Sequence, residues 1–405
     1  MKFKNVIIVN DFAHVNGGAG QVAFSSAKEL AHRGFNVVVF SAVAPIDESL
    51  EFDRVKVVCL AQKDILTEKN RLRAIVQGCW NKKAYDAFKD LLRVYSPSDT
   101  IIHLHGWMKA LSPSILAVTA KTSFKVVLTL HDYFTFCPNG GLFNYQSKKI
   151  CEIKPSSIAC LCENCDARNY PQKVWRYVRQ LFQNYFLRRN KNLTIIYISK
   201  TNRSVSEQAL KEVAKNWCFI QNPVSLYNKV VDISKNEKYL FMGRLSEEKG
   251  CKLFCQAMRD LNLKGVVVGD GYLRESLEQE FPNVEFKGWL SGDEKQKVVK
   301  EAKCFVFPSL WYEGAPLTIV EMKSCGLPSI VPNKCSAAEE IEDGYTGFVF
   351  ESGSIDSLES KILEFEMVDV LQIQANVLNS FDKSKYCLQS HVDSLVCLYC
   401  DMMLS

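Results

Sequence analysis

Residues 305–321 read FVFPSLWYEGAPLTIVE, and this stretch gives the first indication of the fold class. An apolar strand pattern runs into a loop that holds Glu313, and Gly314 then frees the backbone for a tight path. Pro316 suits the first turn of a helix, because its missing N–H is not needed there. The stretch therefore predicts a strand, a glycine-containing loop and a helix, which is the unit from which parallel α/β sheets are built.

The same alternation recurs along the whole chain in two series. Strand-like runs of the first series are residues 6–9, 37–40, 55–60, 100–104, 125–130 and 194–198, and those of the second are 239–242, 265–268, 284–286, 304–307 and 329–331. Helical patterns lie between them, which predicts an α/β fold of two tandem Rossmann-like domains. Ligands of such sheets bind at the carboxyl ends of the strands, so we expect the two domains to face one another across a cleft.

The predicted boundaries divide the chain into three parts. Residues 1–222 form the first domain, with a cysteine-rich insert at 137–165, and residues 223–383 form the second. Residues 384–405 read as a helix that we expect to cross back to the first domain. No apolar run is long enough for a membrane span, and no cleavage site follows the first apolar run, so a cytoplasmic protein is expected.

The formal net charge of +5 conceals a strong asymmetry. Residues 1–225 carry 31 Lys and Arg against 17 Asp and Glu, whereas residues 226–405 carry 19 against 28. The first part is therefore the one expected to meet phosphates or an anionic surface.

The second series holds two groups of candidate donor-binding residues. After the strand at 239–242, Gly243 permits a turn and the cations Arg244 and Lys249 precede a helix, an arrangement that suits a diphosphate. In the opening stretch, Glu313 and Glu321 can accept hydrogen bonds from sugar and ribose hydroxyls. The residues expected at the positive end of the following helix are Gly314, Ala315, Pro316 and Leu317.

These motifs carry a resemblance to a known family. The spacing Glu313-x7-Glu321, preceded by Phe-Pro-Ser and followed by Ser-Cys-Gly-Leu-Pro, resembles the retaining family 4 glycosyltransferases of the GT-B fold, of the bacterial cell-surface polysaccharide type. Gly243-Arg244-Leu, Glu-Lys249-Gly250 and Gly344-Tyr-Thr-Gly347-Phe are similar to the same family. The resemblance runs nearly end to end and is specific in the second half.

The resemblance implies a hexosyltransferase that needs no divalent metal. It moves a sugar from a UDP- or GDP-linked donor to a glycan or lipid-linked oligosaccharide, with retention. By analogy, Arg244 and Lys249 hold the diphosphate, Glu313 faces the donor sugar and Glu321 the ribose. The leaving phosphate would act as the base that takes the proton of the acceptor.

The first half contributes a glycine loop and histidines that end strands. Gly18 lies in a Gly-Gly-Ala-Gly run that resembles the family's loop near the donor phosphate. His105 and His131 each follow a predicted strand. The resemblance gives His131 a contact with the donor sugar and a part in transfer, and we expect His105 to line the acceptor side.

Two features of the first half lie outside these motifs. Cys137, Cys151, Cys160, Cys162 and Cys165 fall within 29 residues, which fits either a structural zinc or a thiol-rich loop. Residues 173–189 form a basic, aromatic-rich helix. It either packs on the sheet with solvated arginines or docks on anionic lipid, and we favour docking.

Three alternative functions compete with the transferase. A nucleotide-sugar epimerase would share the fold but lacks the Glu313-x7-Glu321 context. A phosphorylase needs a pyridoxal-phosphate lysine and a much longer chain. A non-enzymatic, zinc-bearing nucleic-acid-binding protein would leave the donor motifs unexplained, and its basic residues are dispersed, so no nucleic acid is expected as a partner.

Overall fold

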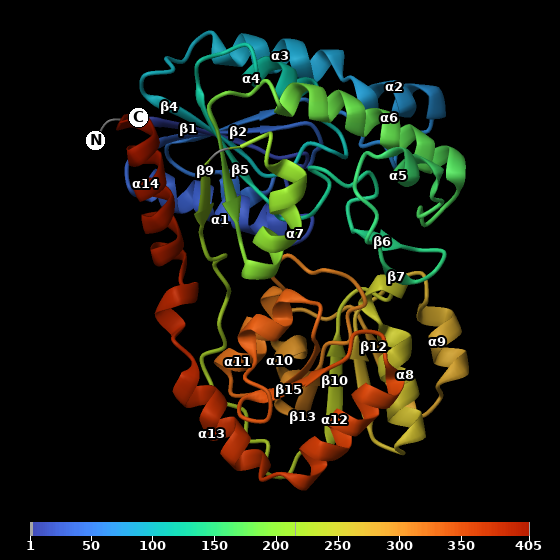
Figure 1. The fold of residues 1–405 in the computed structure, drawn as a ribbon. Helices are drawn as coiled ribbons and strands as arrows, with labels where there is room; N and C mark the ends of the chain where they lie inside the picture. Colours follow the sequence, from blue (N-terminus) through green and yellow to red (C-terminus); the bar gives the residue numbers. More distant parts are fainter. Residues whose placement is uncertain (1–2, 215, 405) are drawn as a thin grey trace. The chain divides into compact units, whose positions relative to one another are not determined.

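The computed structural model describes residues 3–214 and 216–404. The chain forms two compact units, each built around one parallel sheet with helices on both of its faces (Figure 1). The first unit comprises Met1–Gly141, Ile153–Pro223 and Ser384–Ser405, and the second comprises Leu142–Glu152 and Val224–Lys383. Two parallel α/β sheets confirm the predicted fold class.

The sheet of the first unit has the order β3-β2-β1-β4-β5-β8-β9. Its strands are β1 (Asn5–Val9), β2 (Asn36–Ser41), β3 (Val55–Cys59), β4 (Thr100–Leu104), β5 (Lys125–Thr129), β8 (Leu193–Tyr197) and β9 (Asn216–Phe219). The strand order reverses between β1 and β4, which are direct neighbours. This switch point is where open α/β sheets bind ligands.

Helices cover both faces of this sheet, and residues 6–9 of β1 are consequently fully buried. A run of apolar residues without alternation is typical of a strand covered on both sides. The helices of the first unit are α1 (Gly18–His32), α2 (Arg71–Cys79), α3 (Lys82–Leu92), α4 (Ser114–Thr119), α5 (Ile158–Cys162), α6 (Tyr170–Leu187), α7 (Lys200–Leu210) and α14 (Leu388–Leu404).

The second unit repeats the same plan with the order β12-β11-β10-β13-β14-β15. Its strands are β10 (Lys238–Met242), β11 (Gly265–Val268), β12 (Val284–Gly288), β13 (Ala302–Val306), β14 (Ser329–Pro332) and β15 (Gly347–Phe350). Its helices are α8 (Cys251–Asp260), α9 (Arg274–Glu280), α10 (Gly292–Lys300), α11 (Leu317–Ser324), α12 (Ile355–Met367) and α13 (Val370–Ser380).

Successive residues of β10 divide the core of the second unit into two layers. Tyr239 and Phe241 pack in the cluster on one face, and Leu240 and Met242 pack in the cluster on the other. Side chains alternate between the faces of a strand, so a continuous apolar run is needed when both faces are covered. The switch point of this sheet lies between β10 and β13.

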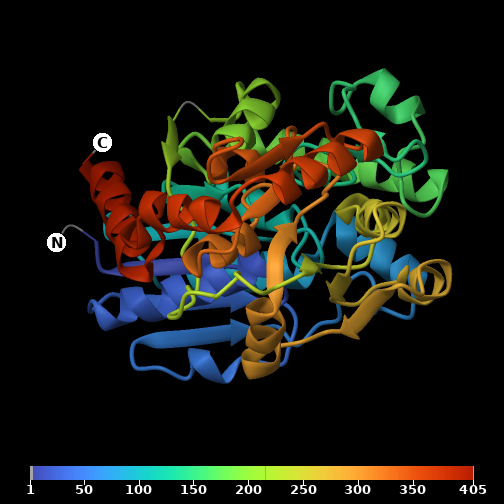
Figure 2. The ribbon, with the colours of Figure 1, turned by 90° about the horizontal axis from the view of Figure 1, so that it is seen from below.

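The C-terminal helix α14 lies against α1 within the first unit (Figures 1 and 2). Arg33 pairs with Asp393 at 2.5 Å, and the Nε2 atom of His391 lies 3.1 Å from the Oγ atom of Ser26. The hydroxyl of Tyr399 lies 2.7 Å from Nδ1 of His103, at the sheet itself. None of the described helices combines the length and the apolar character that a transmembrane span requires.

The cysteine-rich insert is divided between the units, which corrects the predicted boundary. Residues 137–165 were expected to belong wholly to the first domain, but Leu142–Glu152 belongs to the second unit. This segment forms a hairpin of β6 (Phe143–Asn144) and β7 (Lys149–Ile150). Lys148 near its turn pairs with Glu247 at 3.0 Å, a contact that no local sequence pattern predicts.

Candidate active site

The loops that follow β10 and β13 are packed tightly together in the second unit. The N–H of Leu310 donates to the carbonyl of Glu248 at 2.8 Å. Gly250 has φ +68°, and a Cβ atom there would lie 1.9 Å from the carbonyl oxygen of Pro308. Only glycine fits this close approach, so the backbone requires Gly250 of the sequence motif, and the neighbouring Lys249 supplies the charge.

Lys249 and Glu313 form an ion pair between these two loops. The Nζ atom of Lys249 lies 2.6 Å from Oε1 of Glu313, which also accepts a hydrogen bond of 2.8 Å from Ser309. Burial acts to raise the pKa of Glu313, but the Lys249 charge and the hydrogen bonds to this carboxylate together outweigh it, and the pKa is lowered. Glu313 is therefore a carboxylate held in place from two sides.

Arg244 follows β10 directly and is exposed. In the described part of the chain it forms no ion pair, so its guanidinium is available to a ligand. The helix α11 begins at Leu317, one residue later than predicted, and Pro316 precedes it without a side-chain cap. Its first N–H groups are thus open to an anion.

Glu321 lies within α11 and pairs with Lys295 of α10 at 2.6 Å. Tyr227 lies near this pair, with the Nζ atom of Lys295 6.0 Å from its ring centre. Burial, and then the charge of Glu321, raise the pKa of Tyr227. Lys295 and Tyr227 were not predicted as site residues, because Lys295 lies in an ordinary charged helix and Tyr227 in a polar connection.

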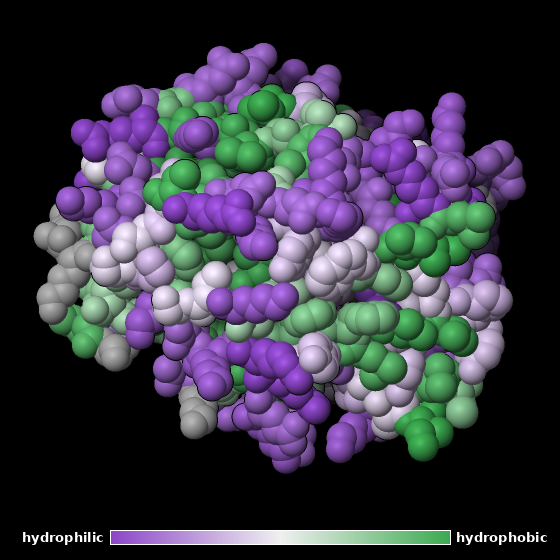
Figure 3. Space-filling view, turned by 90° about the horizontal axis from the view of Figure 1, so that it is seen from above, coloured by the Kyte–Doolittle hydropathy of each residue, from purple (hydrophilic) through white to green (hydrophobic). Residues whose placement is uncertain are grey.

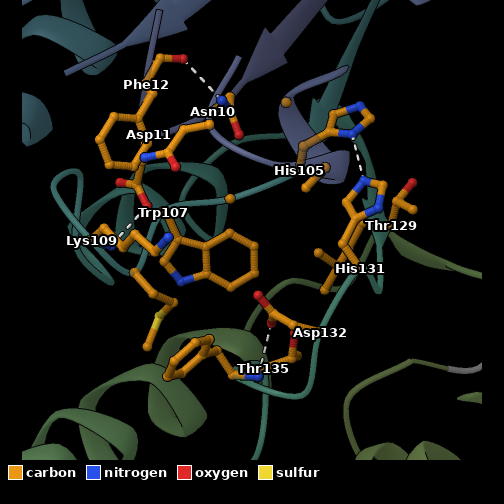
Figure 4. Close-up of a pocket in the computed structure, with 17 residues that line it drawn as sticks. Asn10, Asp11, Phe12, His105, Trp107, Lys109, Thr129, His131, Asp132 and Thr135 are labelled. Atoms are coloured by element: carbon orange, nitrogen blue, oxygen red, sulfur yellow. Dashed lines mark hydrogen bonds between the residues drawn. The ribbon is translucent and has the colours of Figure 1, made fainter. Parts of the chain in front are cut away.

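The switch point of the first unit carries a small cavity of about 80 Å³ (Figure 4). It is lined by residues that follow β1, β4 and β5. The carboxylate of Asp11 accepts three backbone N–H bonds of 2.7–2.8 Å from residues 109–111 and so fixes the loop after β4. Asp11, Trp107 and Asp132 were not predicted as site residues, although each follows a predicted strand closely.

His105 and His131 point toward one another on one side of this cavity (Figure 4). The Nδ1 atom of His105 lies 2.9 Å from Nε2 of His131, so one ring donates to the other. Burial lowers the pKa of both rings, and both are neutral at pH 7. His103 instead bonds to Tyr399 and to Thr129, at 2.7 and 2.8 Å, and supports the sheet.

Gly18 is the first residue of α1 and is exposed. Gly20, two residues later, lines the cavity together with Ala19. The predicted glycine loop thus lies at the rim of the cavity that holds His105 and His131.

Two thiols of the cysteine-rich insert at 137–165 contact a buried lysine. The Nζ atom of Lys173 lies 3.3 Å from Sγ of Cys160 and 3.1 Å from Sγ of Cys165. Among the described residues, no three His, Cys, Asp or Glu side chains are arranged to hold a metal ion. A structural zinc at this segment stays a prediction, which metal analysis of the purified protein would test.

Residues 227–370 match the family model described as "Glycosyl transferases group 1". The UDP-Gal:alpha-D-GlcNAc-diphosphoundecaprenol alpha-1,3-galactosyltransferase of Escherichia coli is 29% identical over 197 residues, which are 45% of this chain and 51% of that protein. The chain thus spans about half the length of that relative.

Solved structures match nearly the whole chain. Sucrose-phosphate synthase from Thermosynechococcus elongatus has a TM-score of 0.73 at 17% identity and covers 99% of both chains. The Anabaena protein HepE, in complex with UDP and glucose, has a TM-score of 0.64 at 16% identity and covers 98% of this chain and 100% of its own. At these identities the likeness shows a shared fold. The second unit therefore carries the matched glycosyltransferase domain, and the chain as a whole shares the fold of these solved structures.

Proposed function

We propose that this chain transfers a hexose from a UDP- or GDP-linked donor to a glycan or lipid-linked oligosaccharide, with retention, in the synthesis of a surface polysaccharide. The observation that carries the proposal is the Lys249–Glu313 pair, which joins the loops after β10 and β13 at the switch point of the matched domain. A cation and a carboxylate held together there suit the two ends of a sugar diphosphate.

Arg244 and Lys249 are proposed to bind the diphosphate of the donor. Arg244 is unpaired in the described structure, and Lys249 can exchange its bond to Glu313 for one to a phosphate oxygen. The N–H groups at the start of α11, around Gly314, Ala315 and Leu317, add a partial positive charge. Together these groups would stabilise the leaving diphosphate without a divalent metal.

The two glutamates are proposed to position the sugar and the ribose. Glu313, ionised and fixed by Ser309, accepts hydrogen bonds from hydroxyls of the donor sugar. Glu321 accepts from the ribose hydroxyls, while its bond to Lys295 orients the carboxylate.

His131 is proposed to contact the donor sugar and assist its transfer, with His105 on the acceptor side. Because both imidazoles are neutral, His131 can donate one hydrogen bond without adding a positive charge. The leaving phosphate oxygen would then take the proton of the attacking acceptor hydroxyl.

The proposed acceptor and location draw on the relatives. The printed name of the Escherichia coli relative gives a UDP-linked donor and a diphosphoundecaprenol-linked acceptor. A lipid-linked acceptor would place this chain in the cytoplasm, at the inner face of the cell membrane. An anionic membrane surface is accordingly part of the proposal.

A panel of UDP-, GDP- and ADP-sugars tests the proposal. Isothermal titration should show binding of at least one of them, and mass spectrometry should show transfer to a saccharide acceptor. Binding followed by interconversion of the sugar without transfer would point to an epimerase instead. If no sugar nucleotide binds, the transferase proposal is wrong.

A further inference from the structure

Helix α6 is built with its polar residues inside and its apolar residues outside. Four of its six buried residues are Lys173, Arg179, Gln180 and Gln183. Its exposed residues include Val178, Leu181, Phe182 and Tyr185, which are 41–51% accessible. A helix that packs on a globular core normally shows the opposite arrangement.

The buried polar face of α6 is held by hydrogen bonds. Gln183 donates to the carbonyls of Phe134 and Thr135, each at 2.8 Å, and accepts from the indole of Trp107. Arg179 donates to the carbonyl of Met108 at 3.1 Å. These bonds fix the rotation of the helix, so its apolar side cannot turn inward.

Helix α2 extends this apolar surface. Leu72, Ile75 and Val76 are 76%, 46% and 64% accessible, while its buried residues are Ala74, Gln77 and Gly78. A Cβ atom on Gly78 would lie 2.5 Å from the Trp175 ring of α6, and the Trp175 indole donates to the carbonyl of Ile75 at 3.1 Å. The two helices therefore form one surface.

We call this surface the α2–α6 face, and define it by its exposed apolar side chains. They are Leu72, Ile75, Val76, Val178, Leu181, Phe182 and Tyr185. Figure 3 views the molecule from above and shows apolar surface gathered on the side where Figure 1 places α2 and α6, with hydrophilic residues around it. A groove of about 340 Å³, lined mainly by apolar surface, opens between the two helices beside Trp175.

The charge around the α2–α6 face is mainly positive, and the neighbouring carboxylates of Glu68, Asp166 and Glu212 are paired with Arg73, Arg176 and Arg188. Residues 69–83 carry five Lys and Arg, residues 168–191 carry seven, and neither segment carries an Asp or Glu. Most of these cations are exposed, including Lys69, Arg73 and Lys191. An apolar centre with a cationic border is the pattern of a surface that lies in the headgroup region of an anionic bilayer.

We infer that the α2–α6 face docks this protein on an anionic lipid bilayer, with the apolar side chains among the acyl chains and the groove taking part of one lipid. A second copy of the chain fits less well, because a symmetric contact would bring the two cationic borders together. This docking rests on the proposed function, because a lipid-linked acceptor is what requires the protein to reach a membrane. The contact includes both α2 and α6, whereas the sequence indicated only the basic helix at 173–189.

Flotation of the full chain with vesicles tests the docking. Vesicles of phosphatidylcholine with phosphatidylglycerol should bind the protein, and vesicles of phosphatidylcholine alone should bind it at least about tenfold more weakly. Binding to the mixed vesicles should fall as salt increases. Equal binding to both kinds of vesicle, or binding to neither, would overturn the inference.

Paired variants locate the contact. Leu181→Gln with Phe182→Gln should weaken binding to the mixed vesicles by about tenfold or more, because two apolar side chains no longer leave water. Trp289→Gln with Met367→Gln, exposed apolar residues of the second unit, are the matched control and should change nothing. Lys69→Gln with Arg73→Gln should reduce the salt dependence, whereas Lys229→Gln with Lys235→Gln should not.

Two further measurements separate the outcomes. Sugar-nucleotide binding should be the same in the Leu181 and Phe182 variant as in the natural chain, so failure of docking and failure of the proposed function are read independently. Sedimentation without lipid shows whether the face joins two copies. If the natural chain is a dimer that these variants dissociate, the face is a contact between two copies and not a membrane contact. If the natural chain binds single-stranded nucleic acid and these variants do not, the face binds nucleic acid instead.

Discussion

The six strands of the second sheet follow the order of the first six strands in the seven-stranded sheet, yet different chemical groups lie at the two switch points. In the second unit, partly buried charged groups face each other, as Lys249 and Glu313 do. In the first unit, His105 and His131 are neutral rings around a small cavity. Since the fold is common to both, the difference lies in the loops, and it underlies the proposal that one unit binds an anion while the other orients a reacting group.

The largest expected effect comes from removing the cations of the second unit. Arg244→Ala combined with Lys249→Ala should lower kcat/KM for the sugar nucleotide by roughly 10³-fold, because two charge-assisted bonds to the diphosphate are lost. Loss of Lys249 should also raise the pKa of Glu313, since the main opposition to the effect of burial is then removed. Steady-state kinetics across pH measures both effects.

Lys252→Ala is the matched control for that experiment. Its side chain is 53% exposed and pairs with Glu280 on the surface of the same unit. A surface pair contributes little, so kcat/KM should stay within about twofold. If kcat/KM of the double variant falls no further than that of this control, Arg244 and Lys249 do not bind the diphosphate, and the proposed difference between the two units is wrong.

Gly250→Ala should damage the same loop through the backbone. The positive φ and the close approach to Pro308 together should lower the free energy of unfolding by about 3 kcal/mol. Gly344 has a similar φ of +74°, but no atom lies near its Cβ position, so Gly344→Ala should cost only about 1 kcal/mol. Urea unfolding compares the two, and equal losses would show that the close approach does not matter.

His131→Ala tests the other side of the comparison. Transfer should fall about 100-fold, because a positioned donor next to the reacting sugar is lost. Binding of the nucleotide, measured with UDP or GDP by titration, should change little. His32→Ala, an exposed ring in the same unit, serves as the control. A nucleotide affinity that drops as far as the rate would mean that the first unit also binds the anion.

The sequence predicted where the proposed donor-binding residues lie in the fold, because strand and helix patterns can be read in order along the chain. Arg244, Lys249, Glu313 and Glu321 all lie just after strands or at the helix that follows, where the parallel fold places them. The pairing of Lys249 with Glu313 was not predicted, since those residues are 64 positions apart and each was given a ligand of its own.

Other features could not be read from local patterns. The hairpin at residues 142–152 belongs to the second unit through contacts such as Lys148 with Glu247, which are distant in sequence. The basic helix at 173–189 was predicted, but the burial of its polar side was not predicted. Burial of Gln180 and Gln183 depends on carbonyl groups of a loop about 45 residues away.

All six histidines of the chain belong to the first unit, which makes the units differ in their response to acid. Burial lowers the pKa of His391 to about 4, and it lowers those of His103 and His105 well below their usual range. A folded pKa below the unfolded value of about 6.5 means that the unfolded state binds the proton more tightly. Stability from these rings is therefore complete above about pH 6.5 and is lost as the pH falls toward the folded pKa.

His391→Gln isolates one ring, because its two bonds, to the carbonyl of Gln221 and to Ser26, can be made by an amide. Between pH 7 and 5.5 the natural chain should lose about 1 kcal/mol more than this variant, since a single proton linked to unfolding changes stability by about 1.4 kcal/mol per pH unit. Hydrogen exchange read by mass spectrometry resolves the units: peptides of the first should show the difference, and peptides of the second should not. If exchange in peptides of both units responds equally to acid, the two units unfold together as one cooperative unit. Their stabilities are then not independent, although their chemical groups differ.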